Sequence, residues 1–427
     1  MRGRWWPWLL LVLALVPALL ISQPHASIGG TPPTADLSEA IFQNPDTLDP
    51  ALANSPSDWA VDSNIFQPLF QMTTTGKVVP ALASHYSISG KAIAITIKPV
   101  ALAGGGHLTA TAVAAALSRP LWPQVKSATA ASLLKPIVGS GQVIAGKAKY
   151  MSGITVDNAT TVTIQLKRQA NLNFIKALAN PALSIVPVAD MSRGGPDWQL
   201  TNLYGTGGYR LQNWNPGGSL TFTKISGPGP SVLSLPIFVS FKQAVLTFEN
   251  QAVTLVPVNP GQLAQVPKKL LPDVRAYRQP GNLYLVYRTA AKRISVYPTV
   301  SIGEWVAKSF RGRIRPLNGQ WPAGLPQGKP MTVYVNQALP EAVRLARTLE
   351  RMKPGRVTVK TVSLSTLTYL AKHNKINAYI GQADLFKAGR TVPLAPLRSL
   401  WLTSPRVYGV KVYANGMLNW HSLSGKP

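Results

Sequence analysis

The chain has 427 residues, of which 46% are hydrophobic, so it is long enough to form two or more lobes, each with its own core. Its 43 Lys and Arg against 15 Asp and Glu give a formal net charge of +28, although charged residues make up only 14% of the chain. The positive balance therefore comes from scarce carboxylates rather than from a dense basic tract, which argues against a dedicated nucleic-acid-binding function. Few carboxylates suit an acidic or anionic exterior, because paired carboxylates lose their charge as the pH falls. The sequence contains no cysteine, which excludes disulfides, thiol nucleophiles, Cys-ligated zinc and lipid attachment through Cys.

The N-terminus has the pattern of an export signal. Arg2 and Arg4 precede an apolar run over residues 9–21, and small residues follow before position 30. The run is shorter than the roughly 20 residues of a membrane-spanning helix. Residues 5–8 lengthen it, so residues 1–29 are predicted to be either a cleaved signal peptide or an N-terminal anchor. Either alternative predicts an extracytoplasmic protein, secreted or attached to the outer face of the cytoplasmic membrane.

Two helices and three strands are predicted in the first half of the chain. Apolar positions between Trp59 and Phe70 fit a helix that packs one face inward. Residues 91–98 alternate as a half-buried strand, and Thr109 is a plausible N-cap for a helix that Pro120 stops. The turn at Asp157-Asn158 joins two strands, residues 153–156 and 161–166.

The second half contains a clear β-α-β-α-β pattern. Strands are predicted over residues 331–335, 356–361 and 376–380, with helices between them. Pro340 occupies a first helical position, and the apolar stripe of the following helix contains Ala342, Leu345, Leu349 and Met352. Such units form a parallel sheet with right-handed crossovers, which predicts an α/β lobe after a mixed α+β lobe.

Catalytic, metal and phosphate sites find little support in the sequence. Asp46 and Asp49 lie in turn-forming contexts, and Asp58 and Asp62 share a helix face where solvated capping is the plain interpretation. The glycine-rich residues 205–208 lack the Lys-Ser/Thr of a phosphate loop and continue as a strand. No enzymatic activity, metal or other cofactor is therefore expected. The histidines are scattered without metal-site spacing: His25, His85, His107, His373 and His421.

An ordered series of short motifs runs along the chain from about residue 37 to residue 420. It comprises Leu48-Asp49-Pro50, residues 65–70, 80–86, 108–110, 204–214, 283–288, 392–394 and 408–410. In this order and spacing, the series resembles the extracytoplasmic solute-binding proteins (family 5 type) of peptide, nickel and oligosaccharide ABC importers. The chain departs from that family in being shorter, chiefly between Asp384 and Val392.

The resemblance implies a two-lobed periplasmic-binding-protein-like α/β fold (type II, cluster C) with mixed sheets and helices packed on them. After the N-terminal segment 1–29, it implies lobe 1 over residues 30–235 and lobe 2 over residues 236–390. Residues 391–427 are then expected to return to lobe 1.

The resemblance also implies a binding role, in which two lobes close on a small peptide-like solute and present it to a membrane permease. The candidate ligand-binding residues are Trp59, Asn64 and Tyr204 from lobe 1 and Arg288, Tyr379 and Asp384 from lobe 2. For the aromatic residues, burial in a core is the competing interpretation. In peptide binders, an Asp after a Gly-aromatic-small run meets the amino terminus of the peptide. Residues 381–384 match that run without its aromatic, so a surface Asp on a shortened loop remains the alternative.

The positive net charge suggests an alternative function. A degenerate, surface-tethered scaffold of the same fold would bind anionic wall polymers or lipids, and its adhesion would be salt-sensitive. Anionic cell-surface polymers are therefore a further candidate partner. Nucleic acid is not expected, because no motif for it is present.

Overall fold

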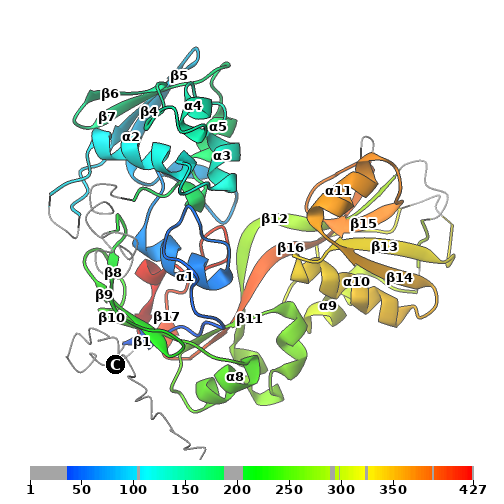
Figure 1. The fold of residues 1–427 in the computed structure, drawn as a ribbon. Coiled ribbons are helices and arrows are strands. Elements are labelled where there is room, and N and C mark those ends of the chain that lie inside the picture. The colour runs from blue at the N-terminus through cyan, green and yellow to red at the C-terminus, as the bar shows by residue number, and fades with distance from the viewer. Residues whose placement is uncertain are drawn as a thin grey trace, which may run out of the picture. The chain divides into compact units, whose positions relative to one another are not determined.

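A computed structural model describes residues 36–102, 106–186, 205–288, 294–297, 299–322, 326–386 and 389–425. The proposed signal or anchor, residues 1–29, lies outside this range. Among the described residues, no helix is long and apolar enough to cross a membrane. The described chain has two hydrophobic cores in the first lobe and two on opposite faces of one sheet in the second. Figure 1 shows the helices and strands that carry them.

The first hydrophobic core contains residues from both the start and the end of the described chain. Helix α1 (Pro56–Ile65) packs against a sheet of order β1-β10-β9-β8, in which β1 is parallel to β10. The buried side chains of Ile65, Phe222 and Trp420 meet in this core. Its other elements are β1 (Leu37–Ser38), β8 (Tyr209–Asn215), β9 (Ser219–Lys224), β10 (Val232–Pro236), β17 (Val407–Tyr408), η6 (Trp420–Ser422) and β18 (Ser424–Gly425).

Helix α1 begins and ends earlier than the periodicity predicts. Ser55 caps it through a capping box with Asp58, and Pro56 occupies its first turn. The helix ends at Ile65, and Phe70 begins the short strand β2 (Phe70–Met72) instead. Apolar residues continue at helical spacing on both sides of Ile65, so the spacing alone predicts a helix that ends too late. The capping residues 55–58 mark the start of the helix more accurately.

The second core lies beneath a four-stranded antiparallel sheet of order β4-β5-β7-β6. Strand β5 (Ala92–Ile97) buries its isoleucines and leaves its alternate residues half-buried, which confirms the predicted alternation. The Thr109 hydroxyl accepts the N–H of Ala112 and caps α2 (Ala110–Ser118), also as predicted. The hairpin itself is confirmed by β6 (Ile154–Asn158) and β7 (Thr161–Gln165). The turn predicted at Asp157-Asn158 was wrong, because Asn158 still pairs with Thr161 and the turn falls at residues 159–160. The remaining elements are β3 (Val78–Pro80), β4 (Ala83–Ser89), η1 (Arg119–Leu121), α3 (Ala128–Leu134), α4 (Ser140–Ile144), α5 (Leu172–Ala177) and η2 (Pro181–Leu183).

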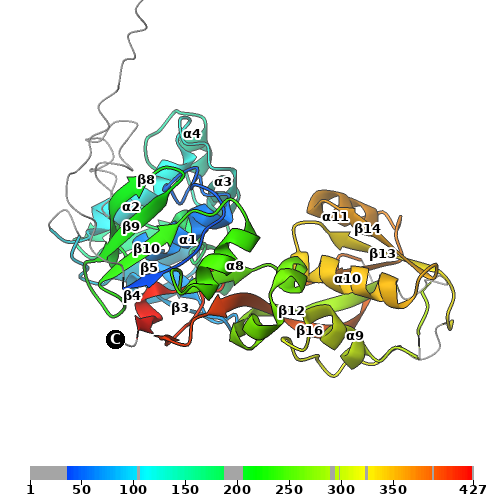
Figure 2. The same cartoon turned by 90° about the horizontal axis from the view of Figure 1, so that it is seen from below.

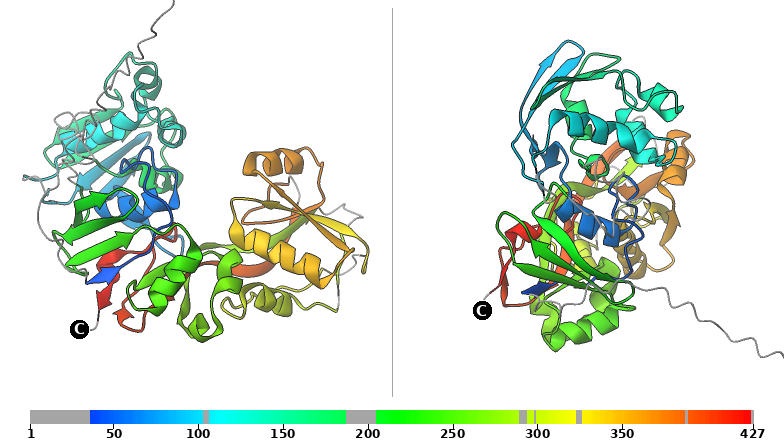
Figure 3. Two further views of the ribbon diagram at one scale, coloured as in Figure 1. Left: turned by 60° about the horizontal axis from the view of Figure 1, so that its bottom comes forward. Right: turned by 60° about the vertical axis from the view of Figure 1, so that its left-hand side comes forward.

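The second lobe is an α/β layer structure on a six-stranded sheet of order β11-β16-β12-β15-β13-β14. Strand β13 (Met331–Asn336) is parallel to both β14 (Val357–Val362) and β15 (Ala378–Gly381), which confirms the predicted β-α-β-α-β unit. Helices α9 (Ile302–Phe310) and α10 (Pro340–Met352) pack on one face, and α11 (Leu364–Lys372) packs on the other (Figure 3). The remaining elements are α8 (Phe241–Glu249), β11 (Leu255–Val258), η4 (Pro260–Gln265), η5 (Lys268–Asp273), β12 (Val274–Arg288) and β16 (Gly389–Thr403).

Two long antiparallel strands, β12 and β16, connect the lobes and run side by side (Figures 1 and 2). Trp401 of β16 packs in the first-lobe core, whereas Leu394 of the same strand packs in the second-lobe core. The register between the strands shifts between Arg278 and Asn282, where Gly281 has a φ of 97°. The predicted boundary at residue 391 therefore falls inside one continuous strand, and the division into lobes at that exact residue stays a prediction.

Candidate functional site

A pocket of about 440 Å³ lies at the carboxyl ends of the parallel strands β13 and β15. Open α/β sheets commonly bind ligands at this edge, because the loops that follow parallel strands converge there. Asn336 ends β13, Gly381 ends β15, and both line the pocket. The mouth also carries the exposed side chain of Gln382 and the largely exposed side chain of Leu364. The pocket thus combines apolar walls with a few amide groups, a composition that suits a small organic solute.

Tyr379 anchors the loop that follows β15. Its buried ring packs against Phe386 with ring centroids 5.2 Å apart. Its hydroxyl donates to the carbonyl of Ala383 at 2.6 Å and accepts the N–H of Leu385 at 2.5 Å. Burial raises the pKa of Tyr379 to about 12, so the phenol stays protonated. Tyr379 lines the pocket, and its polar group supports the loop.

Asp384 is exposed, and its carboxylate holds the same loop. One oxygen accepts the N–H of Phe386 at 2.9 Å, and the other accepts the N–H of Gly389 at 3.0 Å. Arg288, half-buried at the end of β12, lies across the strand pair from Gly389 and donates to the carbonyl of Asn374 at 3.3 Å. Tyr379 and Asp384 thus hold the same loop, and Arg288 lies at the end of β12 opposite Gly389; of the three, only Tyr379 lines the pocket. Contact of these residues with a ligand stays a prediction.

The first-lobe candidates have a different environment. Trp59 is half-buried on α1. Asn64 is 1% exposed, and its amide donates to the carbonyls of Ala60 and Leu418 at 2.9 and 3.0 Å. The oxygen of Asn64 accepts the N–H of Trp420 at 3.0 Å, so the side chain ties α1 to the end of the chain. Tyr204 lies outside the described residues.

A second cavity, of about 250 Å³, lies in the first lobe where the end of α1 meets the C-terminal segment. Its described polar lining consists of side-chain amides and hydroxyls together with Lys176 and His421, without a carboxylate among these residues. Sequence reasoning missed this cavity, because its walls come from three segments far apart in the chain. They include Ser63, Gln67, Asn180, Tyr413, Asn415 and Asn419.

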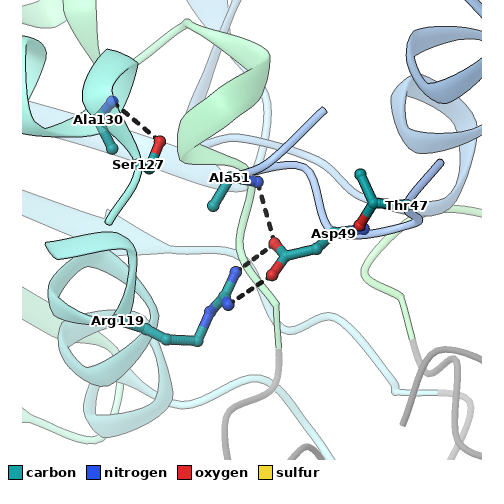
Figure 4. A network of polar contacts seen from close by, with 6 residues as sticks. All are labelled: Thr47, Asp49, Ala51, Arg119, Ser127 and Ala130. Atoms are coloured by element: carbon teal, nitrogen blue, oxygen red, sulfur yellow. Dashed lines mark hydrogen bonds and ion pairs between the residues drawn. The ribbon is translucent and has the colours of Figure 1, made fainter. Parts of the chain in front are cut away.

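Asp49 and Asp58, which lie in and just after the loop before α1, both form hydrogen bonds within the protein. Asp49 forms a buried ion pair with Arg119, with two contacts at 2.7 and 2.5 Å, and also accepts the N–H of Ala51 (Figure 4). The turn role predicted for Asp49 is confirmed. Asp58 accepts the N–H groups of Asn54 and Ser55, among others, and caps α1 from a fully buried position. Capping was predicted correctly there, but the expectation that it is solvated was wrong, because the loop before α1 folds over the carboxylate.

Asp62 differs from its neighbours. It is 1% exposed, and neither carboxylate oxygen has a hydrogen-bond partner among the described residues. Burial raises its pKa well above the ordinary value, and the nearby charges of Asp49 and Asp58 raise it further. The predicted solvated position of Asp62 was therefore wrong, because the helix face that it shares with Asp58 is the buried face. Within the described residues, no group of three histidine or acidic side chains could hold a metal ion.

The glycine-rich residues 205–208 allow the backbone to approach neighbouring segments closely. A Cβ added to Gly205 would lie 1.9 Å from the carbonyl oxygen of Ile65, and one added to Gly208 would lie 2.0 Å from a ring carbon of His421. The chain then continues as β8 rather than as a helix. These glycines are required because the backbone passes directly against α1 and the C-terminal segment, which agrees with the exclusion of a phosphate loop.

Comparison with known proteins identifies the family. Residues 77–296 match the model of bacterial extracellular solute-binding proteins, family 5. The chain belongs to this family. It is 27% identical over 269 residues to the glutathione-binding protein GsiB of Shigella dysenteriae, an alignment that covers 61% of this chain and 48% of GsiB. The chain thus spans about half the length of the curated relatives that it matches.

Solved structures show the fold. The open, unliganded form of the periplasmic murein tripeptide binding protein MppA superposes with a TM-score of 0.70 at 15% identity, covering 91% of this chain and 97% of MppA. OppA of Haemophilus influenzae in complex with the peptide RPPGFSPFR superposes with a TM-score of 0.59 at 14% identity, covering 91% and 98%. The fold is the two-lobed α/β architecture of periplasmic binding proteins, as the sequence predicted. No comparison supports the alternative of a scaffold for anionic polymers.

Proposed function

We propose that this protein is the extracytoplasmic solute-binding component of an ABC importer, and that it binds a peptide-like solute between its lobes and delivers it to a membrane permease. Family membership supports this role. The structural observation that carries the proposal is the pocket at the carboxyl ends of β13 and β15, which would supply the second lobe's side of the binding site. Its wall is fixed by the Tyr379 hydroxyl and by the Asp384 carboxylate, so the pocket is formed before any solute arrives.

The names of the relatives support the solute class. GsiB is a glutathione-binding protein, MppA is a murein tripeptide binding protein, and OppA was solved with RPPGFSPFR. We infer a peptide or a similar small solute for this chain. We also infer that its role is binding rather than catalysis, since these relatives are named as binding proteins.

The proposal is tested by thermal unfolding and calorimetry of the protein lacking residues 1–29, with glutathione, murein tripeptide and RPPGFSPFR as probes. A true solute stabilises the folded state by about 2.7 kcal/mol at a concentration one hundred times its Kd. Gln382→Ala, which alters the pocket mouth, should weaken binding. Gln243→Ala, an exposed position on α8, should leave it unchanged. Absence of stabilisation by every probe would contradict a peptide solute.

The role of Asp384 is tested separately. If its carboxylate meets a cationic amino terminus, Asp384→Asn should weaken binding of a free peptide more than binding of the same peptide with an acetylated amino terminus. Equal weakening of both would show that the side chain acts only by holding the loop through Phe386 and Gly389.

We further propose that the protein is secreted or held at the outer face of the cytoplasmic membrane. Expression with the native residues 1–29, followed by mass measurement of the exported product, distinguishes a cleaved signal from an anchor. Retention of the full-length chain in the cytoplasm would contradict both.

A further inference from the structure

A separate pocket of about 560 Å³ is lined by residues of helix α10 in the second lobe. Figure 1 labels this helix. Arg344, Arg347 and Arg351 line it, and their spacing of three and four residues places them on one face of the helix. Asn259 and Gly261, at the start of η4, and Gln337, at the end of β13, line it as well. This pocket shares no lining residue with the pocket at the carboxyl ends of β13 and β15.

Among the described lining residues of this arginine pocket, Glu350 is the one carboxylate, and it already has partners. One oxygen of Glu350 accepts from Nη1 of Arg347 at 2.8 Å, and the other accepts the N–H of Val359 at 2.9 Å. Within the described part of the chain, Arg344 and Arg351 have no acidic partner at ion-pair distance. The pocket therefore contains two guanidinium groups whose charge the described protein does not neutralise.

Arg344 is held in position by the fold. Its Nε donates to the carbonyl of Ser309 at 2.9 Å, which fixes the guanidinium of a half-buried side chain and leaves its terminal N–H groups without a hydrogen bond among the described residues. Burial lowers the pKa of Arg344, and the positive charges of Arg351 and Arg311 lower it further. Like charges gathered in one hollow cost free energy in the empty protein, and a bound anion would remove that cost.

We propose that this arginine pocket binds a doubly charged phosphate group, either as inorganic phosphate or as a phosphate monoester. Three guanidinium groups and one carboxylate give the lining a net charge of two positive, which matches the charge of a phosphate monoester near neutral pH. The planar forks of Arg344 and Arg351 suit two oxygens of such a group. Asn259 and Gln337 also line the pocket, and their side-chain amides supply further donors.

Isothermal titration calorimetry in a phosphate-free buffer tests the site, with inorganic phosphate and glycerol 3-phosphate as probes. We expect saturable binding of at least one probe, weakened by added NaCl. Arg351→Gln should weaken binding about tenfold, since it removes a charge-assisted hydrogen bond. Arg351 is exposed, so this variant leaves the core intact even if Arg344→Gln fails to fold. Arg406→Gln is the matched control, because it removes an exposed arginine of the first lobe.

The two probes also distinguish the source of the anion. Binding of inorganic phosphate alone identifies a free-phosphate site, and preference for glycerol 3-phosphate identifies a monoester site. Both results support the pocket if Arg406→Gln changes affinity less than twofold. Absence of saturable binding by both probes overturns the proposal, as does equal weakening by Arg351→Gln and Arg406→Gln, which would assign the binding to overall charge.

Discussion

Trp420 donates its indole N–H to a carboxylate oxygen of Glu39 at 2.7 Å, across 381 positions of the chain. Both side chains are buried in the core that joins the two ends of the described chain. Burial raises the pKa of Glu39 to about 8, and the hydrogen bond from Trp420 opposes part of that rise. At acidic and neutral pH the folded protein therefore holds Glu39 mainly in its neutral form.

This raised pKa predicts a protein that is more stable in acid. Below pH 4.5, Glu39 is protonated in both the folded and the unfolded state, so its stabilising contribution is fully present. Between pH 4.5 and about 8, the unfolded chain releases a proton that the folded chain keeps. The free energy of unfolding should therefore fall with rising pH, by up to about 1.4 kcal/mol per pH unit for this group.

Chemical denaturation between pH 4.5 and 8.5 measures this dependence, and Glu39→Gln is the informative variant. Glutamine keeps an acceptor for the Trp420 indole but does not titrate, so the slope of stability against pH should become shallower. An unchanged slope in Glu39→Gln would assign the pH dependence to other groups.

Replacing Asp62 should change the stability of the protein by different amounts at pH 7.5 and at pH 4. Its carboxyl is buried without a partner and is kept neutral by its raised pKa, so ionisation in the folded state is costly. Asp62→Asn should stabilise the protein by about 1–3 kcal/mol at pH 7.5. The gain should shrink at pH 4, where the unfolded chain also holds a protonated Asp62 in a large fraction of molecules. Equal gains at both pH values, measured by urea denaturation, would contradict a neutral buried carboxyl.

Removing one partner of the Asp49–Arg119 ion pair should destabilise the protein strongly. Replacing both partners should destabilise it by less than the two single changes together. Both side chains are about 3–4% exposed, so removal of one partner leaves a buried charge uncompensated. Arg119→Met should destabilise the protein by about 3–5 kcal/mol. The double variant Asp49→Asn with Arg119→Met should lose less than the sum of the two single variants, since no unpaired charge remains. A strictly additive result in the double-mutant cycle would show that the two side chains act independently.

Two glycines with opposite surroundings provide a packing test. Gly205→Ala would place a methyl group against the carbonyl of Ile65 and should destabilise the protein by about 2–3 kcal/mol. Gly141→Ala, in α4, meets nothing within 4 Å and should be neutral or stabilising by up to about 1 kcal/mol. Thermal unfolding of the two variants measures the contrast, and similar losses in both would contradict the close approach at Gly205.

Much of the fold could be predicted from the sequence because its signals are local. The alternation in β5, the Thr109 cap and the Pro340 start of α10 each depend on residues within a few positions of one another. The end of α1 was predicted less well, because apolar residues continue at helical spacing after Ile65 although the chain turns into β2. Burial of Asp58 and Asp62 could not be predicted, because the loop that covers them is an arrangement in space rather than a sequence pattern.

The candidate site could likewise be predicted from the sequence only in part. The resemblance brought attention to Tyr379, which lines a pocket from strand β15, and to Asp384, on the loop that follows that strand. The resemblance did not indicate that Asn64 is fully engaged with the C-terminal segment, because its partners lie more than 350 positions away. The arginine pocket gave no signal either, since three arginines on an amphipathic helix are indistinguishable from an ordinary solvated face until the neighbouring wall is known.

The pairing of Glu39 with Trp420 also constrains the order in which the protein can be assembled. Glu39 and Asn64 lie near the start of the described chain, whereas their partner Trp420 lies more than 350 positions away. Contacts of such long sequence separation form slowly, because a large loop must close before they contribute. Until that loop closes, the first lobe holds an acidic group and an amide that lack their native partners, while strands β13 and β15 pair through contacts of much shorter separation. We therefore expect the first lobe to acquire its native core later than the parallel unit of the second lobe.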